Sequence, residues 1–194
     1  MLSRESTAVG IVGLVAILIA TSVGLSKLPS ASRFRKSAES GDTRSAMKLA
    51  ESGDRNVWNE VVRIVEKGDG RESIIAMFCV PIFFEKNPML EREAVRLAIQ
   101  AAKQEENIRL RIEAMAVLRQ LRCVNGGVID AIDAALSSGN DDLVLEALIC
   151  LTEFAASLDQ KEASGLMDDV KRLRFSKTLS IQQLANALKL ENSP

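Results

Sequence analysis

The sequence predicts an all-α protein with one amino-terminal transmembrane helix followed by a short α-solenoid, a stack of antiparallel helix pairs. Hydrophobic residues make up 47% of the 194 residues but aromatic residues only 4%, a balance that favours helices. A long uncharged stretch comes first, and the remainder breaks into short segments with apolar residues three and four positions apart. No segment shows the sustained alternation of a β-strand.

The uncharged stretch lies between Glu5 and Lys27. At a rise of about 1.5 Å per residue, residues 6–26 can cross a hydrocarbon core of about 30 Å. We therefore predict a transmembrane signal-anchor over residues 1–26. A cleaved secretory signal is the alternative, because "IATSVG" offers small residues for cleavage near Val23. The apolar region of such signals is typically about 7 to 15 residues, which favours the anchor.

Basic residues flank the carboxyl side of this segment. Four of them follow it closely: Lys27, Arg33, Arg35 and Lys36. On the amino side Arg4 is offset by Glu5, so the excess of positive charge predicts a cytosol-facing carboxy-terminal domain. We assign residues 27–36 as a basic juxtamembrane linker. Its side chains either lie on anionic lipid headgroups or only fix the topology.

Within the span, small residues recur four positions apart, at Ala16, Ala20 and Gly24. They form a smooth stripe on one face of a helix, which permits another membrane helix to approach closely. The stripe is therefore a candidate surface for helix packing in the bilayer.

The remaining residues, 37–194, read as a domain of short amphipathic helices. Their predicted ranges are 43–52, 55–67, 71–86, 89–104, 106–122, 127–138, 141–157, 160–174 and 180–190. Pro81 should kink or break the third of these helices, and Pro88 fits the start of a new one.

The pentapeptide Ala-Glu-Ser-Gly-Asp occurs twice, from Ala38 and from Ala50. Its glycines belong to a set that ends apolar segments and precedes Asp or Asn: Gly41, Gly53, Gly68 and Gly139. This is the chemistry of a left-handed helix C-cap that leads into the N-cap of the next helix. A phosphate-binding loop would need more glycines, a Lys and a preceding strand, so we interpret the motif as a helix boundary.

Two segments repeat without a gap at an offset of 33 residues, from Ala98 and from Ala131. The matched pairs are Ala98 with Ala131, Ile99 with Ile132, Ala101 with Ala134, Ala102 with Ala135, Leu110 with Leu143, Glu113 with Glu146, Ala114 with Ala147 and Leu118 with Leu151. Most of these positions are small or aliphatic, as the shared faces of stacked helix pairs require. A weaker third copy pairs Gly68 with Gly139 and Ala76 with Ala147.

The stretches "ENIRLRIEAMAVL" and "GNDDLVLEALICL" resemble the first helix of HEAT or armadillo-type repeats. Each has an acidic or Asn turn, an aliphatic residue, and then a small residue and Leu at helical spacing. The resemblance covers about residues 68 to 157. The turn Pro of many HEAT repeats is absent, and the usual basic position holds Leu145 or, at best, Arg111. The resemblance implies a scaffold that binds proteins on the face lined by second helices, and it names no partner.

Composition argues against most chemistry. The chain has no His and no Tyr, so it lacks the commonest acid-base side chain near neutral pH. Cys79, Cys123 and Cys150 lie among apolar neighbours without CxxC spacing, which predicts buried structural thiols and no zinc site. We expect no enzyme, no cofactor, no metal and no small-molecule substrate.

Charge argues against nucleic acid as a partner. The first 36 residues hold five Lys or Arg and one Glu, which leaves 20 basic and 25 acidic residues and a net charge of −5 in the rest. Asp141 with Asp142 fits helix capping better than a metal site.

The expected partners are proteins, most readily of a membrane complex. Candidate contacts are Trp58, Arg111, Arg119 and Arg122. Trp58 alternatively fills the core, and the three arginines alternatively form a solvated helix flank. The function we expect is a membrane-anchored scaffold for docking or assembly at the cytosolic face. Alternatives are an integral accessory subunit of a larger membrane complex and a secreted or periplasmic adaptor.

Overall fold

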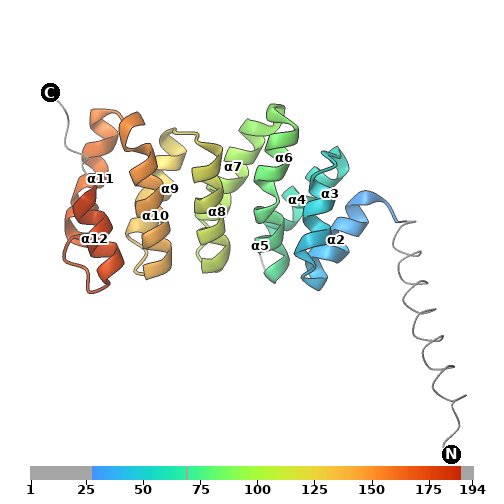
Figure 1. Ribbon diagram of the computed structural model, residues 1–194, viewed down its shortest axis with the longest axis horizontal. Helices are drawn as coiled ribbons and strands as arrows, with labels where there is room; N and C mark the ends of the chain where they lie inside the picture. Colours follow the sequence, from blue (N-terminus) through green and yellow to red (C-terminus); the bar gives the residue numbers. More distant parts are fainter. Residues whose placement is uncertain (1–27, 69, 189–194) are drawn as a thin grey trace, which may run out of the picture.

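The computed structural model describes residues 28–68 and 70–188, and these residues form helices joined by short turns (Figure 1). The α-helices are α2 Ser30–Ser40, α3 Thr43–Ala50, α4 Arg55–Lys67, α5 Gly70–Phe78, α6 Val80–Lys86, α7 Glu91–Ala102, α8 Ile108–Leu121, α9 Gly126–Leu136, α10 Asp141–Phe154, α11 Gln160–Leu173 and α12 Leu179–Ala187. Two 3-10 turns, η1 Pro88–Leu90 and η2 Ala155–Ser157, complete the described part. The prediction of an all-α fold is confirmed.

The helices stack in two layers. The second helices of successive pairs, α5, α8, α10 and α12, pack side by side, and the first helices α4, α7, α9 and α11 form the other layer. In Figure 1 the row runs from α2 in blue at one end to α12 in red at the other. This packing is compatible with a helical repeat.

Helix boundaries follow the glycines that the sequence indicated. The φ angles of Gly41, Gly53, Gly68 and Gly139 are +77°, +63°, +70° and +71°, in the left-handed region that Gly adopts without strain. The residue after Gly41 and the residue after Gly139 each cap the following helix. The side chain of Asp42 accepts a hydrogen bond from the Ser45 amide, and the side chain of Asn140 accepts one from the Leu143 amide.

Proline also acts as predicted. The expected helix 71–86 is divided at Cys79 into α5 and α6, with Pro81 in the first turn of α6. A proline there lacks only an amide that would be unpaired in any case. Pro88 begins η1, which leads directly into α7.

The repeated positions share a core. Both members of most matched pairs are buried, among them Leu110 with Leu143 and Ala114 with Ala147. Ala134 is exposed on α9 whereas its match Ala101 is buried. One assignment is corrected: the segments likened to first helices are the second helices of their pairs, because α8 packs most extensively on the preceding α7 and α10 packs on α9.

The assignment of residues 27–36 as a linker is also corrected. From Ser30 onward these residues belong to α2, which packs against α3, α4 and α5. Phe34 and Ala38, four positions apart on one face of α2, are fully buried in the core. Among the described residues, the packed helices therefore begin at Ser30 and not at residue 37.

The predicted transmembrane helix, with its stripe of Ala16, Ala20 and Gly24, lies outside the described residues. Among residues 28–68 and 70–188, no helix has the length and apolar character needed to cross a membrane.

Candidate functional site

A groove opens between α5 and α8 on the layer of second helices. Its volume is about 750 Å³. The lining residues come from the start of α3, the turns before α5 and α8, α5 itself and the first half of α8: Thr43, Gly68, Gly70, Arg71, Ile74, Ile75, Phe78, Glu106, Asn107, Arg109 and Glu113. Figure 1 shows α5 and α8 as neighbours along the row, with the starts of both helices at the same edge.

Apolar side chains of α5 form one wall of this groove. Ile74 is half-buried, Ile75 is buried, and Phe78 at the end of the helix keeps 43% of its surface exposed. The spacing of Ile74 and Phe78 places both on one side of the helix. An aromatic ring that is half-exposed beside a concave surface is typical of binding sites.

One end of the groove is held rigid by Asn107. Its side-chain oxygen caps α8 by accepting from the Leu110 amide at 3.0 Å, while its nitrogen donates to the Gly68 carbonyl at 3.0 Å. The same amide therefore fixes the start of α8 against the end of α4. Exposed Arg71, Glu106 and Arg109 surround this end, so its rim carries charges of both signs.

The other end of the groove holds Glu113, which is half-buried. Burial raises the pKa of this carboxyl, and the charge of Glu146 on α10 raises it further. No hydrogen bond or ion pair to the Glu113 carboxyl is present within the described residues. A carboxylate in this position destabilises the fold when it is ionised.

Arg119, on the same helix as Glu113, is engaged elsewhere. It donates to Glu146 at 3.0 Å and to Glu153 at 3.1 Å, which joins α8 to α10. Glu113 and Glu146 are the matched acids of the internal repeat, and of these two only Glu146 forms an ion pair with Arg119. The repeat thus places two acids together, and among the described residues Glu113 has no counter-charge.

The other arginines proposed as contacts also have structural roles. Arg111 is only 8% exposed, and its Nε donates to the Ala102 carbonyl at 3.0 Å, which satisfies the end of α7. Arg122 ends α8 with a φ of +51° and is exposed. The three arginines therefore form no common patch, and Arg111 is not available to a partner.

Trp58 is a core residue, which was the alternative that the sequence left open. It is fully buried, its ring meets Phe83 edge-on at 5.5 Å, and its Nε1 donates to Glu93 at 2.8 Å. Arg55 holds the same carboxylate at 2.9 Å, and these donors lower the pKa of Glu93.

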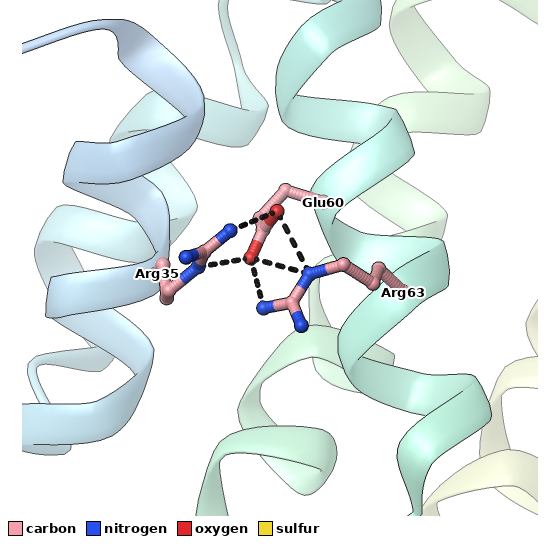
Figure 2. A network of polar contacts seen from close by, with 3 residues as sticks. All are labelled: Arg35, Glu60 and Arg63. Atoms are coloured by element: carbon pink, nitrogen blue, oxygen red, sulfur yellow. Dashed lines mark hydrogen bonds and ion pairs between the residues drawn. The ribbon is translucent and has the colours of Figure 1, made fainter.

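Some of the basic residues that follow the predicted span also have structural roles, and others are exposed. Arg35 donates to the buried Glu60, which also accepts from Arg63 of its own helix (Figure 2). Arg33 is half-buried, and Lys36 is exposed. Lys27 lies outside the described residues. Of the three that the structure describes, Lys36 has an exposed side chain for which no structural contact is present.

Burial of the Glu60 carboxyl opposes its ionisation, but the hydrogen bonds and charges of Arg35 and Arg63 outweigh that effect and lower its pKa to about 2. The cluster is a structural link between α2 and α4. The Ser30 hydroxyl adds a second link by donating to Asp54, the N-cap of α4.

The prediction of buried thiols is confirmed for Cys79 and Cys150 but not for Cys123. All three cysteines are free; Cys79 and Cys150 are buried and Cys123 is half-buried. Burial raises the pKa of Cys79 and of Cys150 to about 12, so neither is a thiolate near neutral pH. In the part of the chain that the structure describes, no group of His, Cys, Asp and Glu side chains is arranged to hold a metal ion.

Large apolar side chains are exposed at two other places. Met89 in η1 is 89% exposed, and beyond α11 Phe175 and Leu179 are 86% and 63% exposed. Sequence reasoning did not find the groove, because its two walls come from helices that α6 and α7 separate in the chain. Comparisons with protein-family models, curated proteins and solved structures gave no match.

Proposed function

We propose that this protein is a membrane-anchored helical-repeat scaffold, which docks a partner protein or assembles a complex at the cytosolic face of a membrane. Residues 6–26 supply the anchor, and the stacked helices supply the binding surface. Binding alone constitutes the activity. Anchoring raises the effective concentration of the docked partner near other membrane components.

The observation that supports this proposal best is the groove between α5 and α8. A stack of helix pairs offers an extended surface of parallel helices, and this surface carries a half-exposed Phe78 and an uncompensated Glu113. Neither feature benefits the isolated fold. Both are expected where a second protein covers the surface.

The link between α2 and α4 supports the anchored arrangement. Because α2 begins at Ser30 and is fixed to α4 by Glu60, no more than a few residues separate the predicted span from the rigid stack. A scaffold tethered in this way would have a restricted orientation relative to the bilayer. The alternative of an integral accessory subunit makes the same use of the stack but adds contacts through the small-residue stripe.

The test compares two tagged chains purified from native membranes in mild detergent, the full chain and a version that lacks residues 1–27. The truncation stops before α2, so that Phe34 and Arg35 remain in place. Mass spectrometry identifies the proteins that accompany each chain. The scaffold account expects the same partner with both chains.

Other results would favour the alternatives. A partner that is retained only by the full chain would make the span the binding element, as expected for an integral accessory subunit. A mature amino terminus near Val23 would indicate a cleaved signal and a secreted or periplasmic adaptor. The absence of any stoichiometric partner for both chains would contradict the proposal.

A further inference from the structure

We infer that the groove between α5 and α8 binds a short amphipathic helix of a partner protein, which places apolar side chains against Ile74 and Phe78 and a Lys or Arg side chain against Glu113. The inference rests on the proposed scaffold function and specifies the chemistry of its partner. Dimensions, the nature of the walls and charge each lead to this occupant.

The dimensions of the groove suit about two turns of helix. The groove follows α5 from Gly70 to Phe78, about 12 Å at the rise of an α-helix, and the apolar side chains of this wall lie along its second half, from Ile74 to Phe78. A volume of about 750 Å³ accommodates several side chains from one face of a helix. Such a helix would present its anchors at positions i, i+3 or i+4, and i+7.

The walls of the groove favour a helix over an extended segment. Both walls are α-helices, whose backbone amides beyond the first turn are paired within the helix. An extended peptide would find no strand edge here to satisfy its own backbone groups. A helical segment satisfies its backbone internally and needs only side-chain contacts from the groove.

The charge of Glu113 indicates that the partner segment carries a cation. Glu113 lines the groove from α8, across from the apolar wall, and is half-buried and close enough to Glu146 for the two carboxylates to repel each other. Arg119 is held by Glu146 and Glu153, so it does not neutralise Glu113. A basic side chain from a partner would form a partly desolvated ion pair at this point, where a charge-assisted hydrogen bond is strong.

The remaining charges limit what else fits. Arg71, Arg109 and Glu106 at the opposite rim carry both signs, so neither a uniformly basic nor a uniformly acidic segment matches the whole groove. A helix with one cation beside its apolar face satisfies Glu113 without opposing the two arginines. The groove thus selects a mixed amphipathic helix.

The experiment uses the full chain in its native host, with the photo-crosslinking residue p-benzoylphenylalanine placed at Phe78. A second version carries it at Phe175, which is more exposed but lies outside the groove. After irradiation of intact cells, mass spectrometry locates the attached partner residue. We expect an adduct at position 78 to a helical segment with Lys or Arg within one turn, and a different or absent adduct at position 175.

Substitution then tests the role of the carboxylate. Glu113→Gln should reduce the adduct at position 78 about tenfold, the factor that corresponds to roughly 1.4 kcal/mol of lost charge-assisted bonding. Glu153→Gln is the control, because Glu153 lies on the adjacent α10 and is already paired with Arg119. It should leave the adduct within about twofold of the original yield, since exposed pairs contribute little.

The possible failures are distinguishable. An adduct at position 78 that Glu113→Gln leaves unchanged, or one to a segment without a nearby cation, would overturn the inference but keep the proposed scaffold. Adducts to lipid or to a second copy of this chain would also overturn it. If no adduct forms at position 78 but a partner still co-purifies, the inference is wrong and the binding surface lies elsewhere on the protein. If neither an adduct nor a co-purifying partner is found, both the inference and the proposed function are wrong.

Discussion

Arg35 on α2 donates to Glu60 on α4 through two nitrogens, with Nε–Oε1 and Nη2–Oε2 distances of 2.6 Å and 3.0 Å (Figure 2). Arg63 approaches the same carboxylate from the other side at 2.6 Å. The carboxylate is buried while both guanidinium groups remain about half-exposed. This carboxylate thus links α2 to α4, in addition to the bond between Ser30 and Asp54 and the burial of Phe34.

Replacement of Glu60 by Gln should destabilise the fold. The loss removes hydrogen bonds between charged groups, which typically contribute about 1.5–3 kcal/mol, while the exposed arginines are resolvated by water. The free energy of unfolding of the detergent-solubilised full chain, measured in urea by circular dichroism, checks this value. Glu153→Gln, which removes an exposed pair on α10, should cost less than about 1 kcal/mol.

The contribution of Glu60 should also depend on pH. Its pKa falls from an ordinary 4.5 to about 2 in the folded protein, so its stabilising effect is complete above about pH 4.5. As the pH drops from there towards 2, the carboxyl takes up a proton and the effect is lost. Thermal unfolding of the original chain and of Glu60→Gln should therefore converge at low pH. A difference that stays constant from pH 7 to pH 3 would contradict this assignment.

Replacement of Glu113 by Gln should have the opposite effect on stability. Burial and Glu146 raise the pKa of this carboxyl, so ionised Glu113 destabilises the fold above its folded pKa. The neutral amide removes this cost, and we expect a higher melting temperature near pH 7. The gain should disappear as the pH falls below the pKa of Glu113 in the unfolded chain, because Glu113 is then protonated in both the folded and the unfolded state. A lower melting temperature of the variant at pH 7 would show that Glu113 stabilises the fold.

Trp58 offers a direct test of the core. It is the only Trp in the chain and is fully buried against Phe83. Its fluorescence in the folded protein should be shifted to short wavelength and protected from acrylamide quenching. Trp58→Ala should cost about 3–5 kcal/mol of unfolding free energy, the range for large aromatic truncations in a core. Strong quenching of the native protein would contradict the burial.

Substitutions at Gly139 and Gly165 together test the helix boundary at Gly139. A Cβ added at Gly139 or at Gly165 has no contact within 4 Å beyond the adjoining backbone, but Gly139 has a φ of +71° and Gly165 lies inside α11. Gly139→Ala should therefore destabilise by about 1 kcal/mol through backbone strain alone. Gly165→Ala should stabilise by about 0.5–1 kcal/mol, since Ala is the better helix former. Equal effects in urea unfolding would contradict the capping role of Gly139.

The sequence predicted those features that local chemistry determines. Gly139 and Asn140 define a helix boundary through backbone conformation and one side-chain bond, and Pro81 breaks a helix because it lacks an amide. The repeated small and aliphatic residues predicted the stacked faces. These signals act within a few residues or recur at a fixed period, so a single chain displays them.

The features that were missed depend on tertiary packing. The charges before Ser37 suggested a linker, although Phe34 and Ala38 had the spacing of a buried helix face. Arg111 fitted a solvated flank by its position, but packing brings it to the Ala102 carbonyl. The groove has no sequence signature, because Phe78 and Glu113 come together only when α5 packs on α8.

The central claim is that the groove between α5 and α8 holds the partner. The most direct measurement is the amount of partner that co-purifies from native membranes with Phe78→Asp, compared with Phe175→Asp as a control of equal chemistry outside the groove. The account predicts that the substitution at Phe78 reduces the partner at least about tenfold, since it places an unpaired charge in an apolar contact, and that the substitution at Phe175 does not. Equal retention of the partner by both variants, at equal levels of folded protein, would contradict the account.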